Sequence, residues 1–169
     1  SQHRKVAVFF IFFLWQVQSR INKGLIVKYW VHPLKLFLKS NLAGASGNYY
    51  VGLHDFEEML FMLHLLKKET VFFDIGSNVG CYSLLASGLK EAQSYAFEPV
   101  PASFHLLNKN VVVNNLQKLV TTYNIGLGDI EGDLYFSENM DTVNHVVFNP
   151  EADQKIIKVP VKRLDNMAS

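Results

Sequence analysis

A glycine-rich turn after an apolar segment is the feature of this sequence best suited to hold a nucleotide. The segment 71–75 is rich in aromatic and branched residues, and Gly76 and Gly80 follow it. Such a turn after a strand lets the backbone approach a bound nucleotide closely. A dinucleotide-binding G-x-G-x-x-G pattern starting at Gly76 needs glycines where Asn78 and Cys81 stand. A G-x-G-x-G pattern has only its middle glycine replaced, by Asn78, and asparagine adopts a left-handed backbone more readily than most residues.

The charge of Asp74, two residues before the first glycine, separates the candidate nucleotides further. A carboxylate at this position repels a pyrophosphate that approaches the N-terminus of the following helix. S-adenosylmethionine has no phosphate and carries a sulfonium and an α-ammonium, which a carboxylate attracts directly or through water. The alternative is that Asp74 only ties the backbone N–H groups of the turn. The sequence therefore predicts S-adenosylmethionine as the cofactor, with Asp74 at its site.

Two further acids follow the next expected strands. Glu98 precedes Pro99 at an offset from the turn close to the ~20 residues at which an acid accepts hydrogen bonds from ribose hydroxyls. Asp129 ends the third strand and is expected to accept from the adenine amino group. A plain surface turn is the alternative for Glu98, and a turn in which the carboxylate bonds its own backbone is the alternative for Asp129. The predicted cofactor-binding set is Asp74, Gly76, Ser77, Asn78, Gly80, Glu98, Pro99 and Asp129.

The elements around these residues alternate between strand and helix, which is typical of a parallel α/β sheet. The expected order is strand 71–75, helix 79–90, strand 94–97, helix 101–115 and strand 119–127. Short strands at 132–137 and 156–161 are expected to form a hairpin-like excursion, with a loop over 137–153.

Residues 1–69 are expected to form a mainly helical region and lid that precedes a partial cofactor-binding domain over 70–169. The expected elements are a buried helix from the apolar run 6–15, a helix over 31–39, a loop over 44–48 and a helix over 55–68. The apolar run is shorter than the roughly 20 residues that span a bilayer, and no A-x-A-like cleavage site follows it. A membrane-associated anchor is the alternative for this run, and a cytoplasmic protein is predicted.

Composition narrows the expected partners. The chain has 169 residues, with 16 basic and 15 acidic residues and a formal charge of +1, which predicts that nucleic acid is not a partner. The single cysteine, Cys81, cannot form an internal disulfide or a metal site with another cysteine, so no metal is expected. Cys81 is expected to pack under a helix; a reactive thiol at a helix N-terminus is the alternative.

Motifs along the chain resemble those of the FkbM-type methyltransferases, a branch of the class I S-adenosylmethionine-dependent enzymes. They are the segments Gly47-Asn-Tyr-Tyr-Val-Gly-Leu53, Asp74-Ile-Gly-Ser-Asn-Val-Gly80, Phe97-Glu-Pro-Val-Pro101, Asn114-Asn115, Gly126-Leu-Gly-Asp129, Thr142-Val-Asn-His-Val146 and Arg163-Leu-Asp165. The resemblance implies a Rossmann-like fold and methyl transfer to a hydroxyl oxygen on a sugar, glycolipid or secondary metabolite. The expected partner is thus a small-molecule or glycan acceptor.

The resemblance also bears on catalysis. A base that takes the hydroxyl proton aids such a transfer, and His145 with Asn144 is preferred over His54 as a substrate-side pair, with a structural role as the alternative. FkbM-like chains continue after the Leu-Asp motif with a further strand beside the first. A fold truncated after the third main strand is therefore expected, with segment 71–75 left at an edge. Weak cofactor binding, little turnover and association through this edge follow from that expectation.

Overall fold

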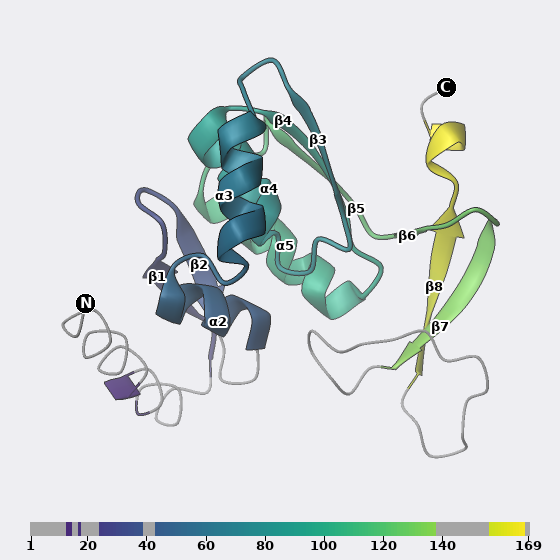
Figure 1. Ribbon diagram of the computed structural model, residues 1–169. Helices are drawn as coiled ribbons and strands as arrows, with labels where there is room; N and C mark the ends of the chain where they lie inside the picture. The colour runs from purple at the N-terminus through teal and green to yellow at the C-terminus, as the bar shows by residue number, and fades with distance from the viewer. Residues whose placement is uncertain (1–12, 15–16, 18–23, 39–42, 138–155, 168–169) are drawn as a thin grey trace.

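The computed structural model describes residues 13–14, 17, 24–38, 43–137 and 156–167. The described strands form three small sheets, and Figure 1 shows helices α3, α4 and α5 together on one side of the parallel sheet. The predicted α/β, Rossmann-like arrangement is confirmed.

The central unit is a parallel sheet of three strands in the order β3-β4-β5. Its elements are β3 (Val71–Ile75), α4 (Cys81–Lys90), β4 (Gln93–Phe97), α5 (Pro101–Val113) and β5 (Val120–Tyr123). Four of these five begin and end within two residues of the ranges predicted from the sequence. Parallel strands need crossover connections, and α4 and α5 supply them.

The third predicted strand, 119–127, is wrong as one element. It divides into β5 and β6 (Gly126–Leu127), and these belong to different sheets. Between them, Asn124 donates hydrogen bonds from Nδ2 to the carbonyl oxygens of Glu98 at 2.8 Å and Pro99 at 3.0 Å. These bonds fix the chain across the end of β4, so it leaves the first sheet after Tyr123.

The second sheet has the order β6-β8-β7, with β7 (Gly132–Ser137) and β8 (Ile156–Lys162) antiparallel. The hairpin-like excursion is confirmed. Residues 138–155, which contain most of the predicted loop, lie outside the described residues.

The predicted helix over 31–39 is wrong. An antiparallel hairpin of β1 (Ile26–Tyr29) and β2 (Lys35–Leu38) occupies this region. Leu34, Leu36 and Leu38 alternate with less buried residues and are themselves buried, which is the period of a strand rather than of a helix. The predicted helix reflects the hydrophobic content of the segment but not this period.

Two asparagines, Asn110 in α5 and Asn114 directly after it, connect this helix to the backbone of β2. Asn110 accepts from the Phe37 N–H at 2.8 Å and donates to the Val79 carbonyl at 2.8 Å. Asn114 accepts from the Lys35 N–H and donates to the Lys35 carbonyl, each at 2.8 Å. These side chains hydrogen-bond the backbone of β2 as a neighbouring strand would, and they hold the hairpin against α5.

The predicted loop over 44–48 is also wrong, because α2 (Ala43–Val51) includes it. A Cβ atom at Gly47 would lie 3.0 Å from Nδ1 of His54. The glycine is therefore explained by the close approach of the His54 ring. Gly52, with φ of 89°, follows the helix in the left-handed conformation common at helix ends.

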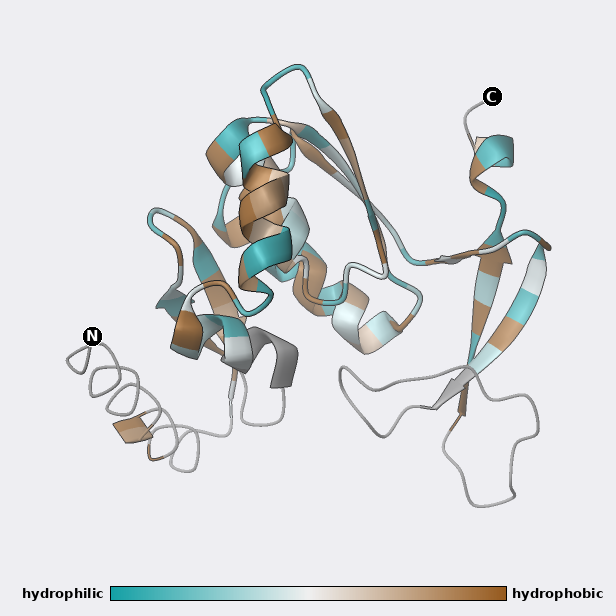
Figure 2. Ribbon diagram, in the orientation of Figure 1, coloured by the Kyte–Doolittle hydropathy of each residue, from teal (hydrophilic) through white to brown (hydrophobic). Residues whose placement is uncertain are grey.

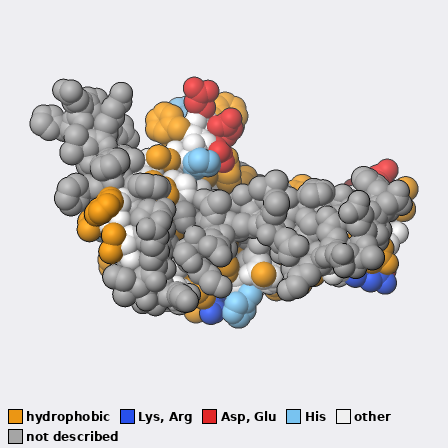
Figure 3. Space-filling view, turned by 90° about the horizontal axis from the view of Figure 1, so that it is seen from below, with side chains coloured by type: hydrophobic (Ala, Val, Ile, Leu, Met, Phe, Trp, Pro, Cys, Tyr) orange, Lys and Arg blue, Asp and Glu red, His pale blue; other side chains and the backbone are white. Residues whose placement is uncertain are grey.

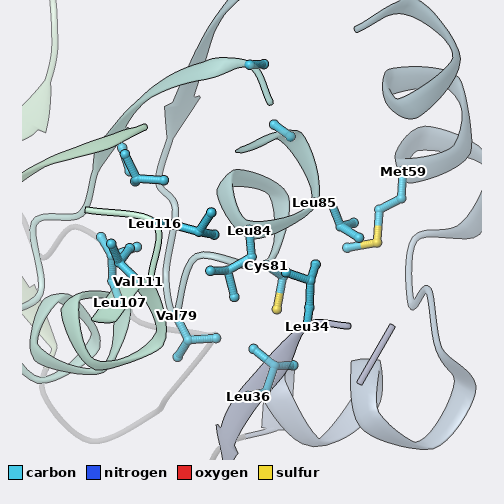
Figure 4. Close-up of a cluster of buried hydrophobic side chains, with 14 of the residues drawn as sticks. Leu34, Leu36, Met59, Val79, Cys81, Leu84, Leu85, Leu107, Val111 and Leu116 are labelled. Atoms are coloured by element: carbon cyan, nitrogen blue, oxygen red, sulfur yellow. The ribbon is translucent and has the colours of Figure 1, made fainter. Parts of the chain in front are cut away.

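The helix predicted over 55–68 is confirmed as α3 (Phe56–Leu65), with Glu57 and Glu58 in its first turn. Met59 and Met62 of α3 enter one buried cluster together with residues of β2, α4 and α5. This cluster contains residues from both sides of the predicted boundary at residue 70. Figure 4 shows the Cys81 side chain among the aliphatic side chains, as predicted for a packed thiol.

Among the described strands, β3 pairs only with β4 and lies at the edge of its sheet, as predicted. Val71, Phe73 and Ile75 are exposed on the face opposite the helices, and Figure 2 shows β3 as a largely hydrophobic strand. A row of stacked rings continues across this face, with centroids 5.4 Å apart for Phe73 and Tyr95.

Of the apolar run 6–15 that was predicted as a buried helix, the structure describes Phe13 and Leu14. Both are helical and exposed, which contradicts burial for these two residues. The rest of the apolar run lies outside the described residues. Within the described part of the chain, no helix is both long and apolar enough to cross a membrane.

Replacing Gly80 with alanine tests the packing of the turn against α5. Gly80 has φ of 88°, and an added Cβ would lie 2.4 Å from Cδ1 of Leu107. We expect Gly80→Ala to lower the unfolding free energy by about 1–2 kcal/mol for the left-handed backbone and by about 1–3 kcal/mol more for the clash. Gly52→Ala is the matched control, because Gly52 has φ of 89° and open space around it. Urea unfolding of both variants measures the difference, and equal losses would contradict the packing argument.

Candidate cofactor site

The turn from β3 to α4 has an unusual backbone. Gly76, Asn78 and Gly80 have φ values of 76°, 49° and 88°. The left-handed conformation expected for Asn78 is confirmed. The N–H groups of Gly76 and Ser77 both donate to the Phe97 carbonyl, at 2.9 and 3.0 Å. The turn is thereby fixed to the end of β4.

Asp74 lies beneath this turn and is 8% exposed. Its Oδ2 accepts hydrogen bonds from the Ser83 backbone N–H at 3.0 Å and from the Ser83 hydroxyl at 2.6 Å. Burial raises the pKa of Asp74, while the two bonds from Ser83 act in the opposite direction. The carboxylate thus ties the end of β3 to the first turn of α4, as the alternative interpretation expected, and it also lines a cavity.

Glu98 is buried at the end of β4 and joins two backbone segments. Oε2 accepts from the Asn78 N–H and Oε1 from the Val100 N–H, each at 2.8 Å. Burial raises the pKa of Glu98, these two hydrogen bonds lower it, and the charge of Asp74 raises it further. Glu98 is therefore a structural partner of the turn, and each oxygen keeps a lone pair for a ligand.

A cavity of about 470 Å³ opens beside the turn, within the size range of small-molecule sites. One wall consists of Asp74, Gly76, Ser77, Asn78 and Val79. A second wall comes from α2, the segment before α3, α3 itself and the first turn of α4, and consists of Asn48, His54, Asp55, Met59, Cys81 and Tyr82.

The lining of this cavity is electrostatically negative. It includes the carboxylates of Asp74 and Asp55, and none of its lining residues is lysine or arginine. The Tyr82 hydroxyl donates to Oδ2 of Asp55 at 3.2 Å. Burial, together with the charge of Asp55, raises the pKa of Tyr82 to about 12. The same arrangement favours a cationic ligand over an anionic one.

Burial raises the pKa of Cys81 to about 12, and the charges of Asp74 and Asp55 contribute. Cys81 is buried, and a thiol with a raised pKa stays mostly protonated at neutral pH, so both observations favour the packed interpretation over the reactive alternative.

Within the described part of the chain, two polar atoms at the turn lack hydrogen-bond partners. They are Oγ of Ser77, whose residue is 7% exposed, and Oδ1 of Asn78. Both residues line the cavity. Leaving a buried polar group without a partner costs about 1–3 kcal/mol, so these atoms are suited to receive a polar ligand.

The structure brings only part of the predicted set together. Asp74, Gly76, Ser77 and Asn78 line the cavity, and Glu98 is bonded to Asn78. Gly80 is the N-cap of α4 and Pro99 follows β4, so both border the turn without lining the cavity. Asp129 is exposed in the turn after β6 and does not line the cavity. The residues Asn144 and His145 lie outside the described residues.

His54, Asp55 and Tyr82 line the cavity but were not among the predicted site residues. His54 had been weighed and set behind His145. The sequence signal for these residues is the pair His54-Asp55, which directly precedes an amphipathic helix.

No protein-family model and no curated protein matches this sequence. Solved structures do match. TYW2 of P. horikoshii in complex with MeSAdo is 21% identical, with a TM-score of 0.53 over 66% of this chain and 40% of that chain. TYW2 of M. jannaschii in complex with AdoMet is 18% identical, with a TM-score of 0.48 over 60% of this chain and 43% of that chain. The tRNA m1G37 methyltransferase of M. jannaschii is 15% identical, with a TM-score of 0.46 over 66% and 36%.

The chain has the fold of the class I methyltransferases. It spans less than half the length of each of these three matched chains.

One expectation about partners is contradicted. The near-balanced charge predicted that nucleic acid is not a partner, yet the matched structures include a tRNA methyltransferase and an RNA methyltransferase. Net charge is a sum over the whole chain and does not report what a local surface binds. It was therefore insufficient for this exclusion.

Replacing Asp74 with asparagine tests the charge of the buried carboxyl. Because folding raises the pKa of Asp74, its contribution to stability is fully present below the unfolded pKa and is lost as pH rises through the folded pKa. An asparagine does not titrate, so the Asp74→Asn variant does not lose this stability as pH rises. From about pH 4 to pH 7, its unfolding free energy should therefore rise relative to wild type, by about 1.4 kcal/mol for each unit by which folding shifts the pKa.

Glu131→Gln is a control of opposite sign. Hydrogen bonds from Asn166 and Arg163 lower the pKa of Glu131, so this variant should lose stability relative to wild type as pH rises. Urea unfolding across this pH range measures both trends. A difference between Asp74→Asn and wild type that does not change with pH would contradict the assignment.

Proposed function

We propose that this chain binds S-adenosylmethionine in the cavity beside the β3–α4 turn and contributes the cofactor site of a methyltransferase. The observation that carries this proposal is the buried Asp74 carboxylate, which lines a cavity that has no lysine or arginine in its lining. A buried carboxylate without a cationic partner is costly. A ligand that carries a sulfonium and an ammonium offsets this cost, whereas a pyrophosphate increases it.

The first turn of α4 supports the same choice. A phosphate at a helix N-terminus uses the backbone N–H groups there. In this chain, the Ser83 N–H already donates to Asp74. The site therefore lacks one of the donors that a dinucleotide needs and has a negative charge in its place. The free Ser77 and Asn78 oxygens remain as acceptors for a polar ligand.

We place the adenosine end of the cofactor at the end of β4. Glu98 is bonded to Asn78 of the turn, and its carboxylate is suited to accept from the ribose hydroxyls. Pro99 adjoins it. Asp129 remains a candidate for the adenine amino group, although the described structure leaves it exposed in its turn.

The bound cofactor supplies an activated methyl group. We propose a hydroxyl oxygen as the acceptor: the oxygen forms a bond to the methyl carbon, the carbon–sulfur bond breaks with its electron pair left on sulfur, and a base takes the hydroxyl proton. The resemblance to FkbM-type enzymes supports this acceptor, on a sugar, glycolipid or secondary metabolite, as well as a substrate-side role for Asn144 and His145. Because named RNA methyltransferases share the fold, RNA belongs in the panel of acceptors to be assayed. A cytoplasmic location remains a prediction from the sequence.

Replacing Glu98 with alanine tests the cofactor site. A hydrogen bond to a charged group contributes about 1.5–3 kcal/mol, so Glu98→Ala should weaken the binding of S-adenosylhomocysteine by roughly 10- to 100-fold per bond lost. Calorimetric titration of the 169-residue chain measures this. Glu91→Ala is the control, because Glu91 is exposed and pairs only with Lys68 at the surface. A Glu98→Ala chain that stays folded and binds as tightly as wild type would overturn the assignment.

Thermal shift distinguishes the cofactor classes. A ligand at 100 times its dissociation constant stabilises the native state by about 2.7 kcal/mol. S-adenosylhomocysteine should stabilise the wild-type chain and NAD(H) should not. Stabilisation by NAD(H) alone would show that the cofactor proposal is wrong.

A further inference from the structure

The cavity has a second carboxylate that the glycine turn does not provide. Asp55 lies directly before α3, is exposed, and lines the same cavity as the residues of the turn. Its Oδ2 accepts from the Tyr82 hydroxyl of α4 at 3.2 Å, so the side chain is held at the boundary between α3 and α4. Figure 3 shows acidic side chains gathered beside hydrophobic and histidine side chains on the face seen from below.

A second observation shows that this cavity is prepared for a ligand. Oγ of Ser77 lies in a residue that is 7% exposed, has no hydrogen-bond partner and belongs to the lining of the same cavity as Asp55. The cavity therefore has a buried polar atom on one wall and a carboxylate on the other.

The positions of Glu98 and of the cavity determine how the cofactor lies across the turn. Glu98, at the end of β4, is bonded to the turn at Asn78 but does not line the cavity. A cofactor whose ribose is bound at Glu98 crosses the turn and extends into the cavity with its other end. This other end is the amino-acid moiety, which carries the α-ammonium.

We infer that Asp55 binds the α-ammonium of the cofactor and that Tyr82 positions its carboxylate for this contact. The inference rests on the proposed function, which it deepens by assigning the amino-acid end to the segment between α2 and α3. The cofactor carries a sulfonium, an α-ammonium and an α-carboxylate. Its two cationic groups and the two carboxylates that line the cavity, Asp74 and Asp55, compensate one another's charge.

The test compares two ligands that differ in this moiety. S-adenosylhomocysteine has the amino acid, whereas 5′-methylthioadenosine lacks it. Asp55→Asn should weaken the binding of S-adenosylhomocysteine by about 10-fold or more and leave the affinity for 5′-methylthioadenosine within about twofold of wild type. Tyr82→Phe should weaken S-adenosylhomocysteine in the same selective way but by a smaller factor, because the carboxylate remains. Calorimetry with the full chain measures each constant.

Glu58→Gln is the matched control, since Glu58 lies in the same first turn of α3 and does not line the cavity. It should leave both affinities within about twofold of wild type. If Asp55→Asn weakens both ligands equally, or neither, the inference is wrong while the proposed function stands. If the wild-type chain binds neither ligand, the proposed function itself fails. If Glu58→Gln matches the loss seen for Asp55→Asn, a general charge effect replaces the assigned contact.

Discussion

The structure around the site depends on one buried carboxylate. Asp74, one residue before the end of β3, accepts two hydrogen bonds from Ser83 in the first turn of α4. These bonds fix how the chain reverses between strand and helix, and the three left-handed residues of the turn make that reversal possible. The Phe97 carbonyl and the Glu98 carboxylate then hold the turn from β4. Removing the carboxylate would leave the turn without its link between β3 and α4.

The turn does not require a buried charge at position 74. Asparagine at position 74 could accept from the Ser83 backbone without the cost of burying a charge. The charge of Asp74 also raises the pKa of Glu98. Local structure that is costly for the folded chain is commonly found at functional sites. Here a cation in the cavity would reduce this cost, because it would stabilise the charged form of Asp74.

Local patterns in the sequence were sufficient for the part of the fold that carries the turn. The apolar run at 71–75, the glycines and the Glu98-Pro99 pair each depend on neighbouring residues, and β3 was predicted to the residue. The hairpin of β1 and β2 was missed although Leu34, Leu36 and Leu38 alternate as in a strand. Its hydrogen bonds to Asn110 and Asn114, more than 70 residues away, follow from no local pattern. The second wall of the cavity was missed for a related reason: no local pattern places Asp55 in the same cavity as Asp74.

The two walls of the cavity are held by different kinds of bonds. The turn is fixed by backbone hydrogen bonds to β4 and by buried carboxylates. In the second wall, Asn48 accepts a hydrogen bond from the His54 N–H, and Asp55 accepts one from the Tyr82 hydroxyl at an exposed contact. A ligand that bonds to both walls adds a connection between them. Binding that orders the second wall against the turn costs conformational entropy. The Met59 side chain of α3 packs in the buried cluster and holds α3 in place before the ligand binds, which reduces this cost.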